Sequence, residues 1–125
     1  MNEPGNGGSQ APRVLIVEDD DLVGETILAM LDEACHATLV TDTATALETL
    51  DADTLVDVIV LDCLLPGGGT ARLLEQADTM QVPVIMISGS SAEIARLGGA
   101  RPSLPKPFSA DDLIGMVRKV ATTHA

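Results

Sequence analysis

Short stretches of consecutive apolar residues alternate along this chain with longer segments in which apolar residues recur every three or four positions. The short stretches have the length and composition of strands buried on both faces, and the longer segments have the period of amphipathic helices. We expect strands at residues 14–17, 38–40, 58–61 and 82–87 and a short one at 103–104. The pattern therefore predicts an α/β fold with five strands and five helices.

Three of the expected helices begin with recognisable capping residues. Asp42 or Thr43 caps the second helix, while Ser90 and Ser109 each stand three residues before an acidic residue, which is the spacing of a capping box. The fourth helix is brief and ends near Leu97. The apolar positions of the other four helices are Val23, Ile27, Met30, Leu31 and Ala34; Ala44, Leu47 and Leu50; Ala71, Leu73, Leu74 and Ala77; and Leu113, Ile114, Val117 and Val120.

Strands and helices that alternate in this way form a parallel sheet covered on both faces, with right-handed crossovers. For a chain of 125 residues the natural arrangement is a flavodoxin-like, doubly wound (βα)5 fold with strand order 2-1-3-4-5. This order places the first and third strands side by side. Their carboxyl ends then flank the switch point of the sheet, where ligands of such folds bind.

Carboxylates stand at both of these strand ends. Glu18 and Asp19 follow the first strand directly, and Asp62 ends the third. Three carboxylates in one small pocket repel one another, and a hard divalent cation relieves the repulsion, which favours Mg²⁺ with Mn²⁺ as the alternative. Lys106 after the fifth strand and Ser88 after the fourth would add an ammonium group and a hydroxyl. Together these groups predict a site for phosphoryl transfer.

The composition narrows the classes of function. With 19 acidic against 7 basic residues the net charge is −12, which opposes binding to nucleic acid. No apolar run is long enough to span a membrane, and the N-terminus lacks the pattern of a secretory signal. Two cysteines form neither a disulfide framework nor a zinc pattern, so we expect a reduced, cytoplasmic setting. Residues 1–12, rich in Gly, Asn and Pro, indicate a disordered leader before a single domain at 13–122.

Four motifs occur in chain order at the ends of the predicted strands. They are Val14-Leu15-Ile16-Val17-Glu18-Asp19-Asp20, Asp62-x-x-Leu65-Pro66-Gly67, Ser88-Gly89 and Lys106-Pro107-Phe108. Together they resemble the receiver domains of two-component response regulators, over nearly all of residues 13–121. The short spacing between the later motifs is similar to that of some stand-alone bacterial receivers with a shortened helix 4. The resemblance implies a domain that phosphorylates and dephosphorylates itself and is not a turnover enzyme.

The resemblance implies a role for each member of the acidic cluster. Asp62 would accept the phosphoryl group as an aspartyl phosphate and contact the metal. Asp19 would bind Mg²⁺ directly, and Glu18 would act through a bound water molecule. The backbone carbonyl of Leu64 would be the remaining protein ligand.

The same resemblance assigns the groups that would hold the phosphoryl group. Ser88 matches the switch hydroxyl, and the small Gly89 leaves the phosphoryl group room to enter. Lys106 would hold a phosphoryl oxygen, with a cis peptide bond before Pro107. Partners implied in the same way are a sensor histidine kinase or a histidine phosphotransfer protein as donor and a downstream protein that the sequence does not name. The chain would be a monomer or a phosphorylation-dependent dimer.

The chain departs from the family pattern on the output surface, where Ser90 and Ser103 fall. Ser103 takes a position that is often aromatic in the family. The intervals from Asp62 to Ser88 and from Ser88 to Lys106 are a few residues short, which predicts abbreviated third and fourth helices. We therefore expect activation to order or shift the segment from Ser90 to Ala100 as a whole, without the exchange of a large ring.

Two other interpretations of the site each need a group that this chain lacks. A phosphatase of the haloacid dehalogenase type needs a second carboxylate two residues after the nucleophile, where this chain has Leu64. A flavodoxin-like cofactor binder needs a phosphate loop rich in glycine and hydroxyls after the first strand, where residues 18–21 are all acidic. A receiver-like interaction module that works without phosphorylation stays open as the alternative.

Overall fold

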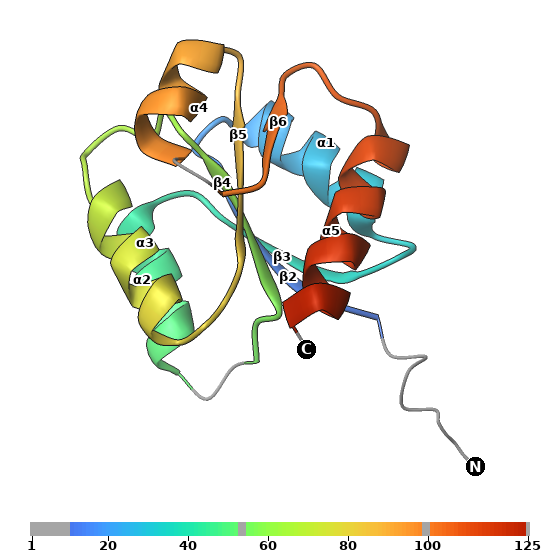
Figure 1. Ribbon diagram of the computed structural model, residues 1–125, viewed down its shortest axis with the longest axis horizontal. Helices are drawn as coiled ribbons and strands as arrows, with labels where there is room; N and C mark the ends of the chain where they lie inside the picture. The colour runs from blue at the N-terminus through green and yellow to red at the C-terminus, as the bar shows by residue number, and fades with distance from the viewer. Residues whose placement is uncertain (1–10, 53–54, 99–100, 125) are drawn as a thin grey trace.

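The centre of the structure is one parallel sheet of five strands (Figure 1). This computed structural model describes residues 11–52, 55–98 and 101–124, so the expected leader at 1–12 lies outside the described residues except for Ala11 and Pro12. The strands are β2 (Arg13–Val17), β3 (His36–Val40), β4 (Val58–Asp62), β5 (Val84–Ser88) and β6 (Ser103–Pro105). Their spatial order is β3-β2-β4-β5-β6, which is 2-1-3-4-5 in chain order. The predicted fold class is confirmed.

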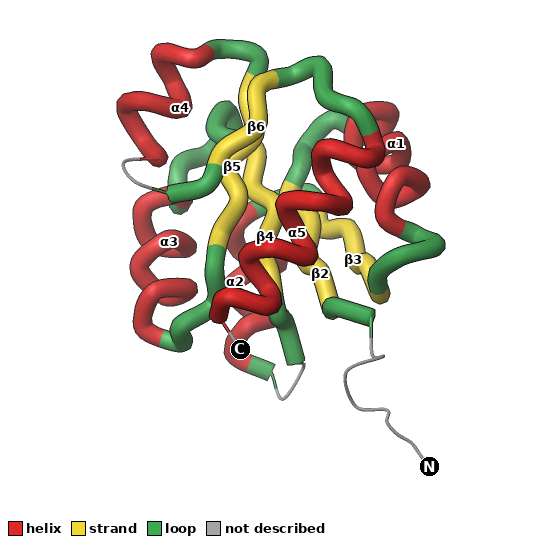
Figure 2. The backbone as a smooth tube through the Cα atoms, turned by 45° about the vertical axis from the view of Figure 1, so that its right-hand side comes forward, coloured by secondary structure: helices red, strands yellow, loops and turns green. Residues whose placement is uncertain are grey.

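Helices cover both faces of this sheet (Figure 2). They are α1 (Asp21–Leu31), α2 (Thr43–Asp51), α3 (Thr70–Thr79), α4 (Ser91–Gly98) and α5 (Ala110–His124). On one face α1 packs beside α5, while α2, α3 and α4 cover the other. Within the described ranges, no helix has both the length and the apolar character needed to cross a membrane.

Each central strand contributes side chains to two separate cores, one on each face of the sheet. In β2, Leu15 and Val17 enter the core under α2, α3 and α4, whereas Val14 and Ile16 enter the core under α1 and α5. Strand β4 alternates in the same way. A strand buried on both faces keeps no polar side, which is why continuous apolar stretches predicted these strands.

The strand register brings the carboxyl ends of the central strands to one edge of the sheet. Val17, the last residue of β2, is paired with Val40 on β3 and with Leu61 on β4. Asp62 is paired in turn with Ile87 on β5. The residues that follow β2, β4 and β5 therefore emerge side by side, as the strand order predicted.

Some details of the helices and strands differ from the prediction made from the sequence. Ala44 and Ala71 are exposed, and Ala46 is the buried alanine of α2, because positions 46 and 50 face the sheet. Helix α1 ends at Leu31, so Ala34 lies in the turn that follows it. Strand β3 has 5 residues where three were expected. Helix α3 has 10 residues and α4 has 8, against 11 in α1 and 9 in α2.

Candidate functional site

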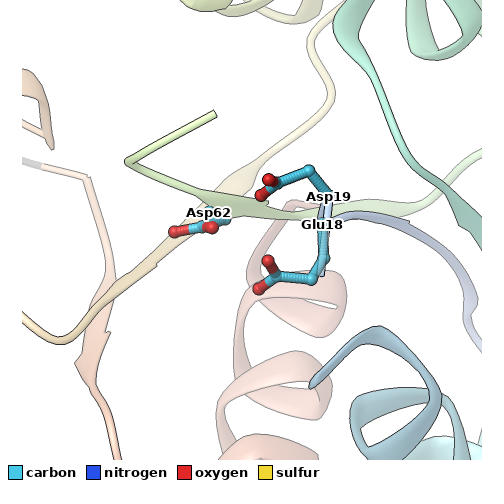
Figure 3. A group of neighbouring side chains, drawn as sticks. All are labelled: Glu18, Asp19 and Asp62. Atoms are coloured by element: carbon cyan, nitrogen blue, oxygen red, sulfur yellow. The ribbon is translucent and has the colours of Figure 1, made fainter. Parts of the chain in front are cut away.

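Three carboxylates meet at the carboxyl edge of the sheet (Figure 3). Glu18 and Asp19 directly follow β2, and Asp62 is the last residue of β4. One carboxylate oxygen from each residue lies within 4.8 Å of the others, and Figure 3 shows the three side chains reaching toward one common region beside the strand ends. Glu18 and Asp62 are buried, with 1% and 5% of their surface exposed, while Asp19 is exposed. The structure thus brings the predicted acidic residues together.

Lys106 supplies a cation to this cluster from the chain that follows β6. Its Nζ atom lies 3.0 Å from Oε1 of Glu18 and 3.8 Å from Oδ1 of Asp62. The backbone N–H of Lys106 donates to the carbonyl of Ser88 at 2.8 Å, which fixes the start of this segment against β5. The peptide bond between Lys106 and Pro107 is cis.

The negative charges of the three carboxylates exceed the positive charge that Lys106 brings to them. Burial raises the pKa of the Glu18 carboxyl; the hydrogen bond from Lys106 lowers this pKa in part, and the neighbouring Asp62 raises it further. One ammonium group therefore faces three carboxylates among the residues that the structure describes here. A set of closely spaced carboxylate oxygens with excess negative charge fits a hard divalent cation such as Mg²⁺.

Ser88 and Gly89 lie next to the cluster, at the end of β5. Ser88 is fully buried, and its hydroxyl oxygen accepts a hydrogen bond from the N–H of Ser90 at 3.0 Å. Gly89 is exposed, and a Cβ placed on it would meet no atom within 4 Å. Open space therefore exists beside the residue that the resemblance assigned to phosphoryl entry.

The two residues assigned to the output surface have different surroundings. The hydroxyl oxygen of Ser90 accepts from the N–H of Glu93 at 3.3 Å and so caps α4. The reciprocal bond of a capping box is not formed, because the Ser90 N–H donates to Ser88 and the Glu93 carboxylate accepts from Arg96. Ser103 is half-buried in β6, beside Met86 of β5.

The loop that follows Asp62 contacts a residue that sequence reasoning considered only as a helix cap. Asp42 caps α2, since its carboxylate accepts from the N–H of Thr45 at 2.7 Å. This leaves the hydroxyl of Thr43 free to donate to the carbonyl of Gly68 at 3.1 Å. The two residues are 25 positions apart, and no local pattern in the sequence pairs them.

Cys63, next to Asp62, packs as a small apolar residue. It is 4% exposed and belongs to the core under α2, α3 and α4. Burial raises the pKa of its thiol, and the charge of Asp62 raises this pKa further. A thiol of raised pKa is mostly protonated near neutral pH and is therefore a poor nucleophile.

The model of the response regulator receiver domain family matches residues 14–118. Two curated relatives are the sensory transduction protein RegX3 of Mycobacterium tuberculosis, 36% identical over 113 residues, and the transcriptional regulatory protein CpxR of Escherichia coli, 33% identical over 116 residues. Each alignment covers 86% of this chain, but 49% of RegX3 and 48% of CpxR. The chain therefore spans about half the length of the curated relatives it matches.

Solved receiver structures share the fold. The receiver domain of Francisella response regulator 1452 is 27% identical with a TM-score of 0.77, and the match covers 91% of this chain and 99% of that one. The receiver domain of a sensor histidine kinase from Pseudomonas aeruginosa, which has a magnesium ion in its active site cleft, is 24% identical with a TM-score of 0.79, over 90% and 98% of the two chains. With a family match from residue 14 to residue 118 and the matching strand order, this chain belongs to the response regulator receiver domains of two-component signalling.

Proposed function

We propose that this receiver domain accepts a phosphoryl group on Asp62 with the help of Mg²⁺. The observation that carries the proposal is the cluster of three carboxylates within 4.8 Å, two of which lie beside the ammonium group of Lys106. Asp19 and Asp62 would bind the metal directly, Glu18 would act through water, and the carbonyl of Leu64 would complete the protein ligands. Mn²⁺ would occupy the same oxygen donors.

The reaction that fits these groups is transfer from a phosphohistidine to a carboxylate. An Oδ atom of Asp62 forms a bond to phosphorus as the bond from phosphorus to the imidazole nitrogen of the donor breaks, and the imidazole leaves with the bonding electrons and takes up a proton. When bound, Mg²⁺ neutralises charge on the phosphoryl oxygens and on the carboxylates. Hydrolysis of the aspartyl phosphate returns the domain to its starting state.

The chain's own residues hold the incoming group. Lys106 lies close enough to Asp62 for its ammonium to move from the carboxylate to a phosphoryl oxygen. The Ser88 hydroxyl, which accepts from the Ser90 N–H, keeps its own proton available to donate to the phosphoryl group. Gly89 keeps the entrance free of a side chain.

Receiver domains are signalling modules that partner with histidine kinases, and they are not turnover enzymes. We propose a sensor histidine kinase or a histidine phosphotransfer protein as the donor for this one, in the cytoplasm. The net charge of −12 favours a downstream partner that is a protein and not a nucleic acid. We propose that the chain acts as a monomer or as a phosphorylation-dependent dimer.

Intact-mass spectrometry with a small phosphodonor and Mg²⁺ tests this proposal. Wild type should gain the mass of one phosphoryl group, and Asp62→Asn should not. Asp111→Asn, which removes an exposed carboxylate in the first turn of α5, is the matched control and should be modified like wild type. A wild-type chain that stays unmodified would favour the phosphorylation-independent interaction module, and modification of Asp62→Asn would place the acceptor elsewhere.

A further inference from the structure

We propose that Thr43 is a positioning residue for the loop that carries the phosphoacceptor chemistry. The acceptor loop, residues 63–69, runs from Asp62 to the start of α3. The hydroxyl of Thr43, the first residue of α2, donates to the carbonyl of Gly68 near the end of this loop at 3.1 Å. The inference rests on the proposed function, because it concerns the same metal and phosphoryl site.

The two ends of the acceptor loop are held differently. At its start, the N–H of Cys63 donates to Ile87 of β5 at 2.9 Å, and the N–H of Leu64 donates to Oδ1 of Asp62 at 3.2 Å. Toward its end, three consecutive glycines have φ angles of 84°, 74° and 88°. Glycine loses more conformational freedom on folding than any other residue, so a run of three is costly to order unless a contact holds it. Among the described residues, Thr43 is the one whose side chain hydrogen-bonds to the acceptor loop from another helix.

A second observation shows that the contact is closely fitted. A Cβ built on Gly69 would overlap Oγ1 of Thr43 and lie 3.2 Å from its Cβ. At Gly67 and Gly68, by contrast, an added Cβ would meet nothing within 4 Å. All three positions favour glycine because their φ angles are positive. Position 69 also excludes a larger residue because Thr43 lies too close for an added Cβ. The loop and the helix start therefore fit each other at this point.

Thr43 also belongs to the part of the fold that holds the other side of the acidic cluster. Three residues before it, the carbonyl of Val40 accepts from the N–H of Glu18 at 3.1 Å. The segment from β3 to α2 thus contacts the Glu18 side of the site through Val40 and the acceptor loop through Thr43. By holding the loop in one place, Thr43 lowers the ordering cost of presenting the Leu64 carbonyl to a metal.

The test compares Thr43→Val, which keeps the shape of the side chain but removes the donor, with Thr43→Ser, which keeps the donor. Mg²⁺ affinity is measured by titration while following backbone amide NMR shifts. Loss of one net hydrogen bond predicts that Thr43→Val binds Mg²⁺ about 2- to 10-fold more weakly, with Thr43→Ser close to wild type. In the metal-free protein, amide exchange at residues 67–70 should be faster in Thr43→Val. Unchanged affinity and unchanged exchange in Thr43→Val would overturn the inference.

Glycine variants provide the second arm. Gly67→Ala and Gly69→Ala both place a side chain at a positive φ angle, but only Gly69→Ala meets Thr43, so it should weaken Mg²⁺ binding more. Adding Thr43→Ala should restore part of the binding lost in Gly69→Ala and none of that lost in Gly67→Ala. Equal effects of the two glycine variants would contradict the contact. If wild type binds no Mg²⁺, the proposed function fails, while amide exchange in the metal-free variants still decides whether Thr43 holds the loop.

Discussion

Lys106 and Glu18 are 88 positions apart in the chain, yet the Nζ atom of the lysine lies 3.0 Å from Oε1 of the glutamate. Glu18 is 1% exposed, so its carboxylate has lost nearly all contact with water. A buried carboxylate is tolerated when a partner of opposite charge and hydrogen bonds replace the lost hydration. The pair therefore joins the end of the last strand to the end of the first and holds the acidic cluster in shape.

Removing the ammonium group should destabilise the fold. In Lys106→Met, Glu18 keeps its hydrogen bond from Asp20 but loses its cationic partner. We expect the free energy of unfolding in Mg²⁺-free buffer at neutral pH to fall by about 1–3 kcal/mol, as measured by urea denaturation. Lys119→Met, at an exposed lysine of α5, is the control and should change little. A Lys106→Met variant with the same free energy of unfolding as wild type would show that the pair between Lys106 and Glu18 does not stabilise the fold.

Removing one carboxylate of the cluster should have the opposite effect. Asp62 raises the pKa of Glu18, through the close approach of the two carboxyl groups and through its charge, so the two carboxyl groups oppose each other's full ionisation in the fold. Asp62→Asn removes this repulsion, and Lys106 keeps its shorter contact to Glu18. Without metal we expect this variant to gain on the order of 1 kcal/mol and to melt at a higher temperature. The control Asp111→Asn should melt like wild type, and a clearly lower melting temperature for Asp62→Asn would contradict the repulsion.

A salt bridge between the end of α3 and the segment before β6 should give a defined pH dependence. Arg101 donates two hydrogen bonds to the carboxylate of Asp78 at the end of α3, at 2.8 Å and 2.7 Å. This pairing lowers the pKa of Asp78, so its contribution to stability is present above the usual pKa of an aspartate, about 4, and is lost as the pH falls through the lowered value.

Asp78→Asn should therefore be less stable than wild type at pH values near neutrality, and the difference should disappear in strong acid. Because the Asp78 carboxylate is mostly exposed, solvent screening limits the expected loss to about 0.5 kcal/mol. Urea denaturation across the acidic range measures it. Glu75→Gln, on the same helix, is the control. A difference that persists at the lowest pH would assign the effect to something other than the ion pair.

The sequence predicted the features that depend on the local pattern of residues and on strand order. Strands β2, β4 and β5 are buried on both faces, so each leaves an unbroken apolar stretch. The edge strand β3 is half exposed, with His36 and Thr38 facing solvent, and its pattern therefore predicted only part of it. The acidic cluster was predictable because strand order alone brings three strand-end carboxylates together.

Contacts between side chains far apart in the chain could not be predicted in the same way. The bond from Thr43 to Gly68 and the pair between Asp78 and Arg101 join loops and helix ends across 25 and 23 positions. Nothing in the local pattern of either partner identifies the other. The burial of Ala46 in place of Ala44 likewise depends on where the cap of α2 sets the phase of the helix.

The last prediction concerns the segment that would carry the signal. Ser88 accepts from the Ser90 N–H, and the Ser90 hydroxyl oxygen accepts from the N–H of Glu93 in the first turn of α4. One hydrogen-bonded series therefore runs from the proposed phosphoryl-binding hydroxyl into the start of this helix. Ser103 offers no large ring that could move between exposed and buried positions on β6. Helix α4 has 8 residues, a length at which packing and capping decide whether it stays formed.

Phosphorylation should therefore act on α4 through its cap. With beryllofluoride and Mg²⁺, which mimic the phosphoryl group, amide exchange should change most at residues 88–98. Ser90→Ala removes the cap of α4, which costs about 1 kcal/mol locally, and should lose this response while Asp62 is still phosphorylated. Ser109→Ala removes the equivalent cap of α5, where the Ser109 hydroxyl oxygen accepts from Asp112, and should respond like wild type. A response centred on another face, or one that persists in Ser90→Ala, would rule out this route, because the hydroxyl of Ser90 would then have no part in carrying the change from Ser88 to the helix.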